Sequence, residues 1–159
     1  MTGIVGDGDP SLQERFFPTM TCFGCGPINP KGLRLASYPA TDGTAATVAT
    51  FVPWTEHDNG LGYLNGGIIC TLLDCHSATP MILEADRLGL LTGEVPLPFV
   101  TAGLNVRYLR PSPLTEPVDL RASLVDASES AVTVEVELLW EGKTRAAATA
   151  VWRRWRPRA

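Results

Sequence analysis

The sequence predicts an α+β domain in which one long, central helix is wrapped by a curved antiparallel β-sheet. A stretch from Tyr63 to Ser77 has apolar residues at helical spacing around much of its circumference, which indicates a buried helix. From Val100 onward, apolar residues alternate with a period of two in successive runs, which indicates half-buried strands. One buried helix followed by an antiparallel meander favours a sheet that curls around that helix.

The length and composition predict a single domain. The chain has 159 residues, of which 45% are hydrophobic and 19% are charged, enough for one substantial core. Residues 1–21 are predicted to be an irregular lead-in, because Gly, Asp and Pro are frequent there. The folded domain is expected to span residues 22–155, and residues 156–159 to form a basic tail.

Two short strands are predicted before the helix. Residues 33–38 and 45–52 are the expected strands, and Asp42-Gly43 between them is a hairpin signal. The Gly-rich segment 54–64 is expected to be a loop.

The helix is predicted to begin after Asn65, a favoured N-cap residue. Pro80 is expected to end or kink it, because proline removes a backbone hydrogen bond and clashes with the preceding turn. Thr79 would then cap a second turn that runs to about Leu88. Beyond a loop at 89–98, strands are expected at 100–109, 118–126, 131–140 and 144–155.

The charge balance argues against nucleic acid as a partner, since the formal net charge is −4 and the isoelectric point is about 5.1. The N-terminal residues are polar and lack the apolar region of a signal peptide. We therefore expect a cytoplasmic protein with reduced cysteines and no membrane association. Arginines near the C-terminus predict either a solvated tail or a contact with an anion.

The start of the helix has the features of an oxyanion site. Gly66 and Gly67 follow the cap, where backbone N–H groups lack intrahelical partners and the helix dipole favours negative charge. Glycine also lets a substrate carbonyl approach the backbone closely. Asp74 lies eight residues beyond Gly66 and on roughly the same side, too far away to act on the same group. A second subunit that supplies one of the two would resolve this separation.

Simpler interpretations of these residues exist. An acidic residue in a helix can pair with an arginine or cap a neighbouring loop, and a glycine pair can serve close helix packing. Cys70 shares a face with Asp74 and is expected to pack as a small apolar side chain.

The chain resembles the PaaI-like branch of the hotdog-fold acyl-CoA thioesterases, within the 4-hydroxybenzoyl-CoA thioesterase superfamily. The resemblance rests on the pattern N59-x5-N65-G66-G67-x6-D74, the later TAGLNVRYLRP and the opening CFGCGPINPKGL, and it covers about residues 22–155. It implies a hotdog fold and a homodimer or homotetramer with active sites at the dimer interface. The substrate implied is an acyl-CoA, with CoA as part of the substrate and no separate cofactor.

The resemblance also implies roles for individual residues. Asp74 would act as general base or nucleophile, and the N–H group of Gly66 would polarise the thioester carbonyl. Asn59 and Thr101 would orient Asp74 or the water. The family usually has His where this chain has Asn65, which can cap the helix and donate a hydrogen bond but cannot exchange a proton near neutral pH.

Several further residues are candidates for substrate contacts. Asn65 and Gly67 adjoin the predicted carbonyl site, and Arg110 stands at a strand end where CoA phosphates could bind. His57 is either a surface loop residue or a replacement for the missing family His, whereas His76 points to another face than Asp74 and is expected to be structural.

The cysteines offer a metal-binding alternative. Cys22 and Cys25 have the spacing of metal ligands, and Cys75 and His76 would have to complete the site. Because those two are adjacent on a helix and diverge, we expect no metal. Two alternatives to hydrolysis on the same fold stay open, a non-catalytic acyl-CoA-binding protein and a hydratase or dehydratase.

Overall fold

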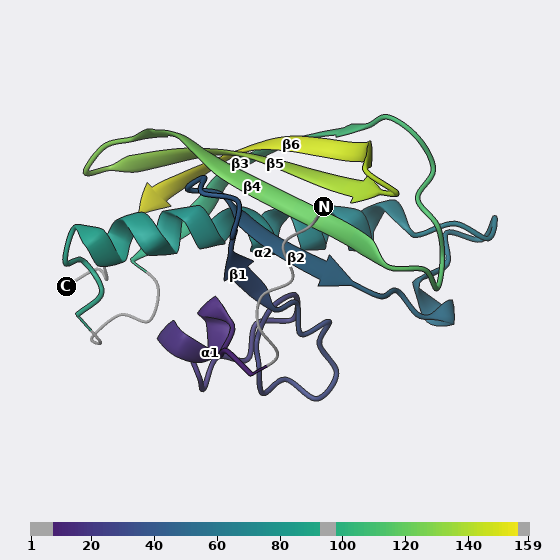
Figure 1. The fold of residues 1–159 in the computed structure, drawn as a ribbon, viewed down its shortest axis with the longest axis horizontal. Helices are drawn as coiled ribbons and strands as arrows, with labels where there is room; N and C mark the ends of the chain where they lie inside the picture. Colours follow the sequence, from purple (N-terminus) through teal and green to yellow (C-terminus); the bar gives the residue numbers. More distant parts are fainter. Residues whose placement is uncertain (1–7, 93–97, 156–159) are drawn as a thin grey trace.

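The computed structural model describes residues 8–92 and 98–155, so the predicted tail 156–159 and part of the predicted loop 89–98 lie outside the described residues. A six-stranded antiparallel sheet in the order β1-β2-β4-β5-β6-β3 covers one side of the long helix α2 (Figure 1). The elements are α1 (Leu12–Phe16), β1 (Ser37–Pro39), β2 (Thr47–Phe51), η1 (Thr55–His57), α2 (Gly66–Arg87), β3 (Phe99–Tyr108), β4 (Val118–Ala127), β5 (Ala131–Trp140) and β6 (Lys143–Arg154).

The predicted fold class is confirmed. The last four predicted strands agree with β3 to β6 at both ends to within one residue, and β5 agrees fully. The expected hairpin is formed, with Tyr38 paired to Val48, although β1 has only three residues. The helix and the inner face of the sheet share one core, in which Leu72, Met81 and Leu138 are completely buried.

The predicted start of α2 is confirmed, because the side chain of Asn65 caps the helix. Of the two outcomes expected at Pro80, an end to the helix is wrong, because α2 continues through the proline to Arg87. Pro80 cannot donate to the carbonyl of His76 one turn earlier. The Thr79 hydroxyl donates to that carbonyl instead, at 2.8 Å, so the helix passes the proline without leaving a buried carbonyl unpaired.

The expected irregular lead-in contains one short helix in the part that the structure describes. Residues 12–16 form α1, which is capped reciprocally by Ser11 and Glu14. The sequence Ser11-Leu-Gln-Glu14 is a capping-box signal that the high content of glycine and proline nearby obscured. Leu12 is buried, and the helix α2 lies between the sheet and this N-terminal segment (Figure 1).

A buried polar network joins α2 to the first hairpin. His76 is fully buried, with Nδ1 2.9 Å from Ser37 Oγ and Nε2 3.1 Å from the Thr47 carbonyl. A carbonyl only accepts, so Nε2 carries the proton and Nδ1 accepts from Ser37. The side chain of Gln13 donates in turn to Ser37 Oγ. Burial lowers the pKa of His76 to about 4, and the expectation that this residue is structural fits its contacts.

Among the described helices, α2 is long and apolar enough to cross a membrane by length and composition. However, 61% of its most apolar window is buried inside the protein, as in the core helix of a globular domain.

Candidate active site

Asp74 is held in place by a residue of the neighbouring strand β3. The Thr101 hydroxyl donates to Asp74 Oδ1 at 2.8 Å, so the structure brings together two of the predicted site residues. Burial raises the pKa of Asp74, and the hydrogen bond from Thr101 acts in the opposite direction. The carboxylate is half-buried on a helix with apolar neighbours.

Asp74 opens onto a cavity of about 180 Å³ between α2 and the N-terminal segment. Apart from Asp74 and Gln13, the wall consists of apolar side chains and thiols, namely Phe17, Met20, Cys22, Cys25, Cys75, Ala78, Ile82 and Trp152. The cavity has the character of a site for an apolar group beside a carboxylate.

The start of α2 leaves one backbone donor free. Asn65 Oδ1 accepts from the N–H groups of Gly67 and Ile68, at 2.8 and 3.3 Å, so Gly67 is engaged by the cap. The N–H of Gly66 has no hydrogen-bond partner in residues 8–92 and 98–155, which suits it to bind an oxyanion. Because Oδ1 of Asn65 is the acceptor, its Nδ2 group is left as a donor.

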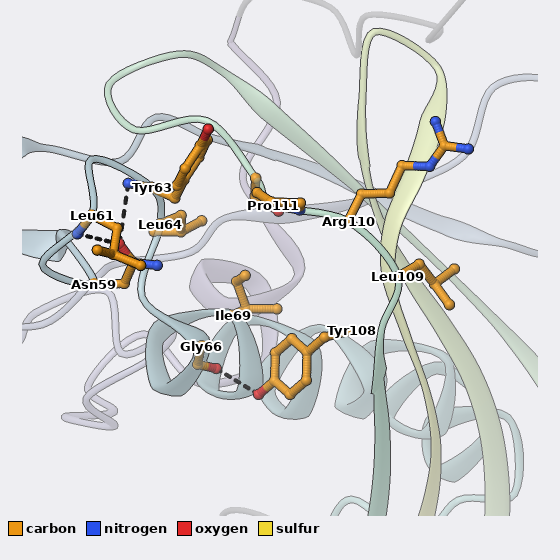
Figure 2. Close-up of a pocket in the computed structure, with 11 residues that line it drawn as sticks. Asn59, Leu61, Tyr63, Leu64, Gly66, Ile69, Tyr108, Leu109, Arg110 and Pro111 are labelled. Atoms are coloured by element: carbon orange, nitrogen blue, oxygen red, sulfur yellow. Dashed lines mark hydrogen bonds between the residues drawn. The ribbon is translucent and has the colours of Figure 1, made fainter.

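A second cavity, of about 400 Å³, lies at this helix start (Figure 2). It is lined by residues from the loop before α2, from α2 itself and from the end of β3, including Asn59, Gly66, Tyr108 and Arg110. The Tyr108 hydroxyl donates to the Gly66 carbonyl at 2.7 Å, which fixes the aromatic ring against the first turn of the helix.

Asn59 and Arg110 lie on this second cavity and not beside Asp74 of the same chain. The Asn59 side chain accepts from the N–H groups of Leu61 and Tyr63, at 2.8 and 3.3 Å, and thereby shapes the loop. Arg110 is exposed at the cavity rim, and Figure 2 shows its guanidinium directed away from Gly66.

The interpretation of His57 as a surface residue is wrong. The residue is 6% exposed, because its ring packs against the rings of Trp54 and Phe51, with centroid distances of 3.7 and 5.7 Å. Its carbonyl accepts from the N–H of Asn65 at 2.8 Å, so His57 helps to position the residue that caps α2. Burial also lowers its pKa. It does not line either of the two cavities.

The two cavities are separate within one chain. They share no residue, and eight residues of helix place Gly66 about 12 Å from Asp74 along the axis. This separation follows from the sequence spacing, whereas the contact of Tyr108 with Gly66 and the N-terminal wall of the first cavity do not. Tyr108 is one of the alternating apolar residues of β3. This alternation shows on which face of the sheet Tyr108 lies, but not which residues that face contacts.

A family model described as the thioesterase superfamily matches residues 61–147, which is more than half of the chain. The chain belongs to the thioesterase superfamily. The match covers Gly66, Asp74 and Thr101, and the resemblance to the PaaI-like thioesterases is confirmed. Acyl-coenzyme A thioesterase 13 of Homo sapiens is 29% identical over 83 residues, which are 52% of this chain and 53% of the relative. The chain thus spans about half the length of the curated relatives it matches.

Several solved structures share the fold of this chain. A phenylacetic acid degradation-related protein from Ralstonia eutropha JMP134 has a TM-score of 0.61 and 26% identity, covering 76% of this chain and 85% of that one. A superfamily protein from Shewanella loihica PV-4 has a TM-score of 0.61 and 29% identity, over 77% and 91%. A Bacillus halodurans protein solved with CoA has a TM-score of 0.62 and 24% identity, over 79% and 77%.

Proposed function

We propose that this thioesterase superfamily member hydrolyses an acyl-CoA to a carboxylic acid and free CoA. The observation that carries the proposal is the half-buried Asp74 carboxylate, which Thr101 orients beside an apolar cavity. The free N–H of Gly66 at the start of the same helix supplies the complementary oxyanion donor. Acyl-coenzyme A thioesterase 13 supports the substrate class by its name, and the Bacillus halodurans protein by its bound CoA.

A homodimer would bring the two cavities together as halves of one active site. β3 is an edge strand of the sheet, and it carries both Thr101, which contacts Asp74, and Tyr108, which contacts Gly66. Antiparallel pairing of β3 with its copy, about a twofold axis near Leu104 and Asn105, would set Thr101 close to the partner's Tyr108. The exposed apolar side chains of Val100, Tyr108 and Leu109 along this strand and its end support such an interface.

In such a dimer the chemistry is divided between two chains. The thioester carbonyl accepts from the Gly66 N–H of one subunit while the acyl group enters the cavity beside Asp74 of the other. Asp74 takes a proton from water, the water oxygen bonds to the carbonyl carbon, and the C–S bond breaks to release the CoA thiolate. Attack by Asp74 itself is the alternative: a carboxylate oxygen bonds to the carbonyl carbon while the CoA thiolate leaves, which forms a mixed anhydride. Water then cleaves the anhydride at the Asp74 carbonyl and releases the carboxylic acid, so that one oxygen from labelled water stays in Asp74 after a single turnover.

Release of free thiol tests the proposed function. The purified full chain is incubated separately with short-chain, long-chain and aromatic acyl-CoAs, and the concentration of free thiol is measured over time. Turnover of at least one class above the rate without protein is the expected result. Absence of hydrolysis across the panel would contradict the proposal.

A non-catalytic acyl-CoA-binding role is the second candidate. It is favoured by Asn65, whose amide caps the helix and donates but cannot exchange a proton as the family His can. Saturable binding of an acyl-CoA without release of thiol would support it. On either function we expect the protein to act in the cytoplasm and to need no separate cofactor.

Replacing Thr101 by valine should lower kcat/KM by about 10-fold to 100-fold, because a hydrogen bond to a charged group contributes about 1.5–3 kcal/mol. Valine keeps the side-chain shape but cannot donate to Asp74. Thr101→Ser is the matched control, since it keeps the hydroxyl and should retain most of the activity. Equal rates for Thr101→Val and wild type in steady-state assays would remove Thr101 from the mechanism.

A further inference from the structure

Three of the four cysteines meet in space although two distant segments supply them. Cys22 and Cys25 lie in the loop after α1, and Cys75 lies in the middle of α2. Cys22 Sγ is 3.8 Å from Cys75 Sγ, and all three sulfur atoms lie within 4.8 Å of one another. Cys70, on the same helix, is not part of this three-thiol cluster.

Backbone structure holds the loop of the cluster against the helix. A Cβ added at Gly24 would lie 2.3 Å from Cys75 Sγ and 3.0 Å from Thr71 Cγ2, so only glycine lets the loop approach this closely. The Gly26 N–H donates to the Cys22 carbonyl at 2.9 Å, and the Leu35 N–H donates to the Gly24 carbonyl at 3.0 Å. The thiols of Cys22 and Cys25 are therefore held next to Cys75 by a loop that these two backbone hydrogen bonds stabilise.

We propose that Cys22, Cys25 and Cys75 form a binding site for a thiophilic metal ion, with Zn²⁺ as the ion that best fits the geometry. Two sulfur ligands of a tetrahedral Zn²⁺ at about 2.3 Å are about 3.8 Å apart. The Cys22–Cys75 separation already has this value, and the other two pairs need to close by at most about 1 Å. Thiolates are the ligands that select Zn²⁺ and Cu⁺ over harder ions.

The surroundings provide access and a position for a fourth ligand. All three cysteines line the cavity of about 180 Å³ beside Asp74, and Cys22 is only partly buried. A metal ion can enter there, and a water molecule in the cavity can take the open coordination position. Each thiol that becomes a ligand loses its proton to solvent as the metal–sulfur bond forms.

This site departs from the expectation of no metal. That expectation paired Cys75 with His76, and the two do diverge, since His76 faces Ser37 and Thr47 on the first hairpin. The structure instead brings Cys75 alone to the loop thiols. Metal binding would tie the N-terminal segment to α2 and would form part of the wall of the cavity beside Asp74.

Cobalt titration tests the proposal on the reduced, tag-free full chain after treatment with a chelator. Co²⁺ bound by thiolates gives a near-ultraviolet charge-transfer band, which should saturate at about one equivalent per chain and disappear when Zn²⁺ is added. Cys25→Ser and Cys75→Ser should each lose the band. Cys70→Ser is the matched control and should keep it, and circular dichroism checks that each variant is folded.

The absence of a charge-transfer band in the folded wild-type chain would overturn the proposal whatever the variants do. A band that persists in both Cys25→Ser and Cys75→Ser, or that disappears equally in Cys70→Ser, would overturn it as well. The charge-transfer band measures the number of Co²⁺ ions bound per chain, and it does not depend on the proposed thioesterase function. A chain that binds Co²⁺ without hydrolysing thioesters, or the reverse, separates the two conclusions.

Discussion

Asp74→Asn should reduce the kcat/KM of thioester hydrolysis by about 10²–10⁴-fold, the typical contribution of a positioned general base. Asparagine has nearly the same shape as aspartate and can still accept from the Thr101 hydroxyl, so the local packing is preserved. It cannot take a proton from water near neutral pH. The loss should therefore fall on kcat, while KM for the same acyl-CoA changes little.

Asp86→Asn is the matched control, because Asp86 is an exposed acidic residue near the C-terminal end of the same helix. It removes one negative charge without touching either cavity and should leave kcat/KM within about twofold of wild type. The two variants are compared by steady-state thiol release, with thermal unfolding as a check of the fold. If Asp74→Asn hydrolyses as fast as Asp86→Asn, Asp74 is not the general base.

His76→Leu should reduce the free energy of unfolding by about 2–5 kcal/mol. Leucine has a similar volume, so the change removes hydrogen bonds with little change of packing. The Ser37 hydroxyl loses its acceptor and the Thr47 carbonyl loses the Nε2 donor, both in a region shielded from water. An unpaired buried polar group costs about 1–3 kcal/mol. Urea denaturation at neutral pH, where His76 is neutral, measures the loss.

A double-mutant cycle with Ser37→Ala distinguishes broken hydrogen bonds from poor packing. Ser37→Ala alone also removes a donor to His76 Nδ1 and an acceptor for Gln13. The double variant leaves no hydroxyl to be orphaned by the leucine, so it should lose clearly less stability than the sum of the single changes. Strict additivity would show that the Ser37 and His76 side chains are not coupled, so that the hydrogen bond between them does not account for the loss.

Periodicity accounts for the parts of the fold that the sequence predicted well. The alternation in β5 and the apolar circumference around Leu72 and Leu73 reflect burial that each segment requires by itself. The continuation of α2 beyond Pro80 was not predictable in this way. It depends on the Thr79 hydroxyl, which takes over the carbonyl that proline cannot bond.

The sequence predicted candidate residues for the site but not how these residues are arranged. The spacing of Gly66 and Asp74 predicted that the two residues lie far apart on one helix, and the cap formed by Asn65 followed from its residue type. The burial of His57 depends on Trp54 and Phe51, whose rings meet it only after the loop closes. The approach of Cys75 to the loop thiols likewise depends on how the N-terminal segment packs on α2, which no local pattern encodes.

The separation of Gly66 and Asp74 has a genetic consequence if the active site forms between two chains. A chain that has lost its carboxylate still offers an intact helix start, and a chain with a blocked helix start still offers its carboxylate. In a mixed dimer of two such chains, one site combines both defects and the other combines both intact halves. Two inactive alleles of this protein would therefore complement each other within one dimer.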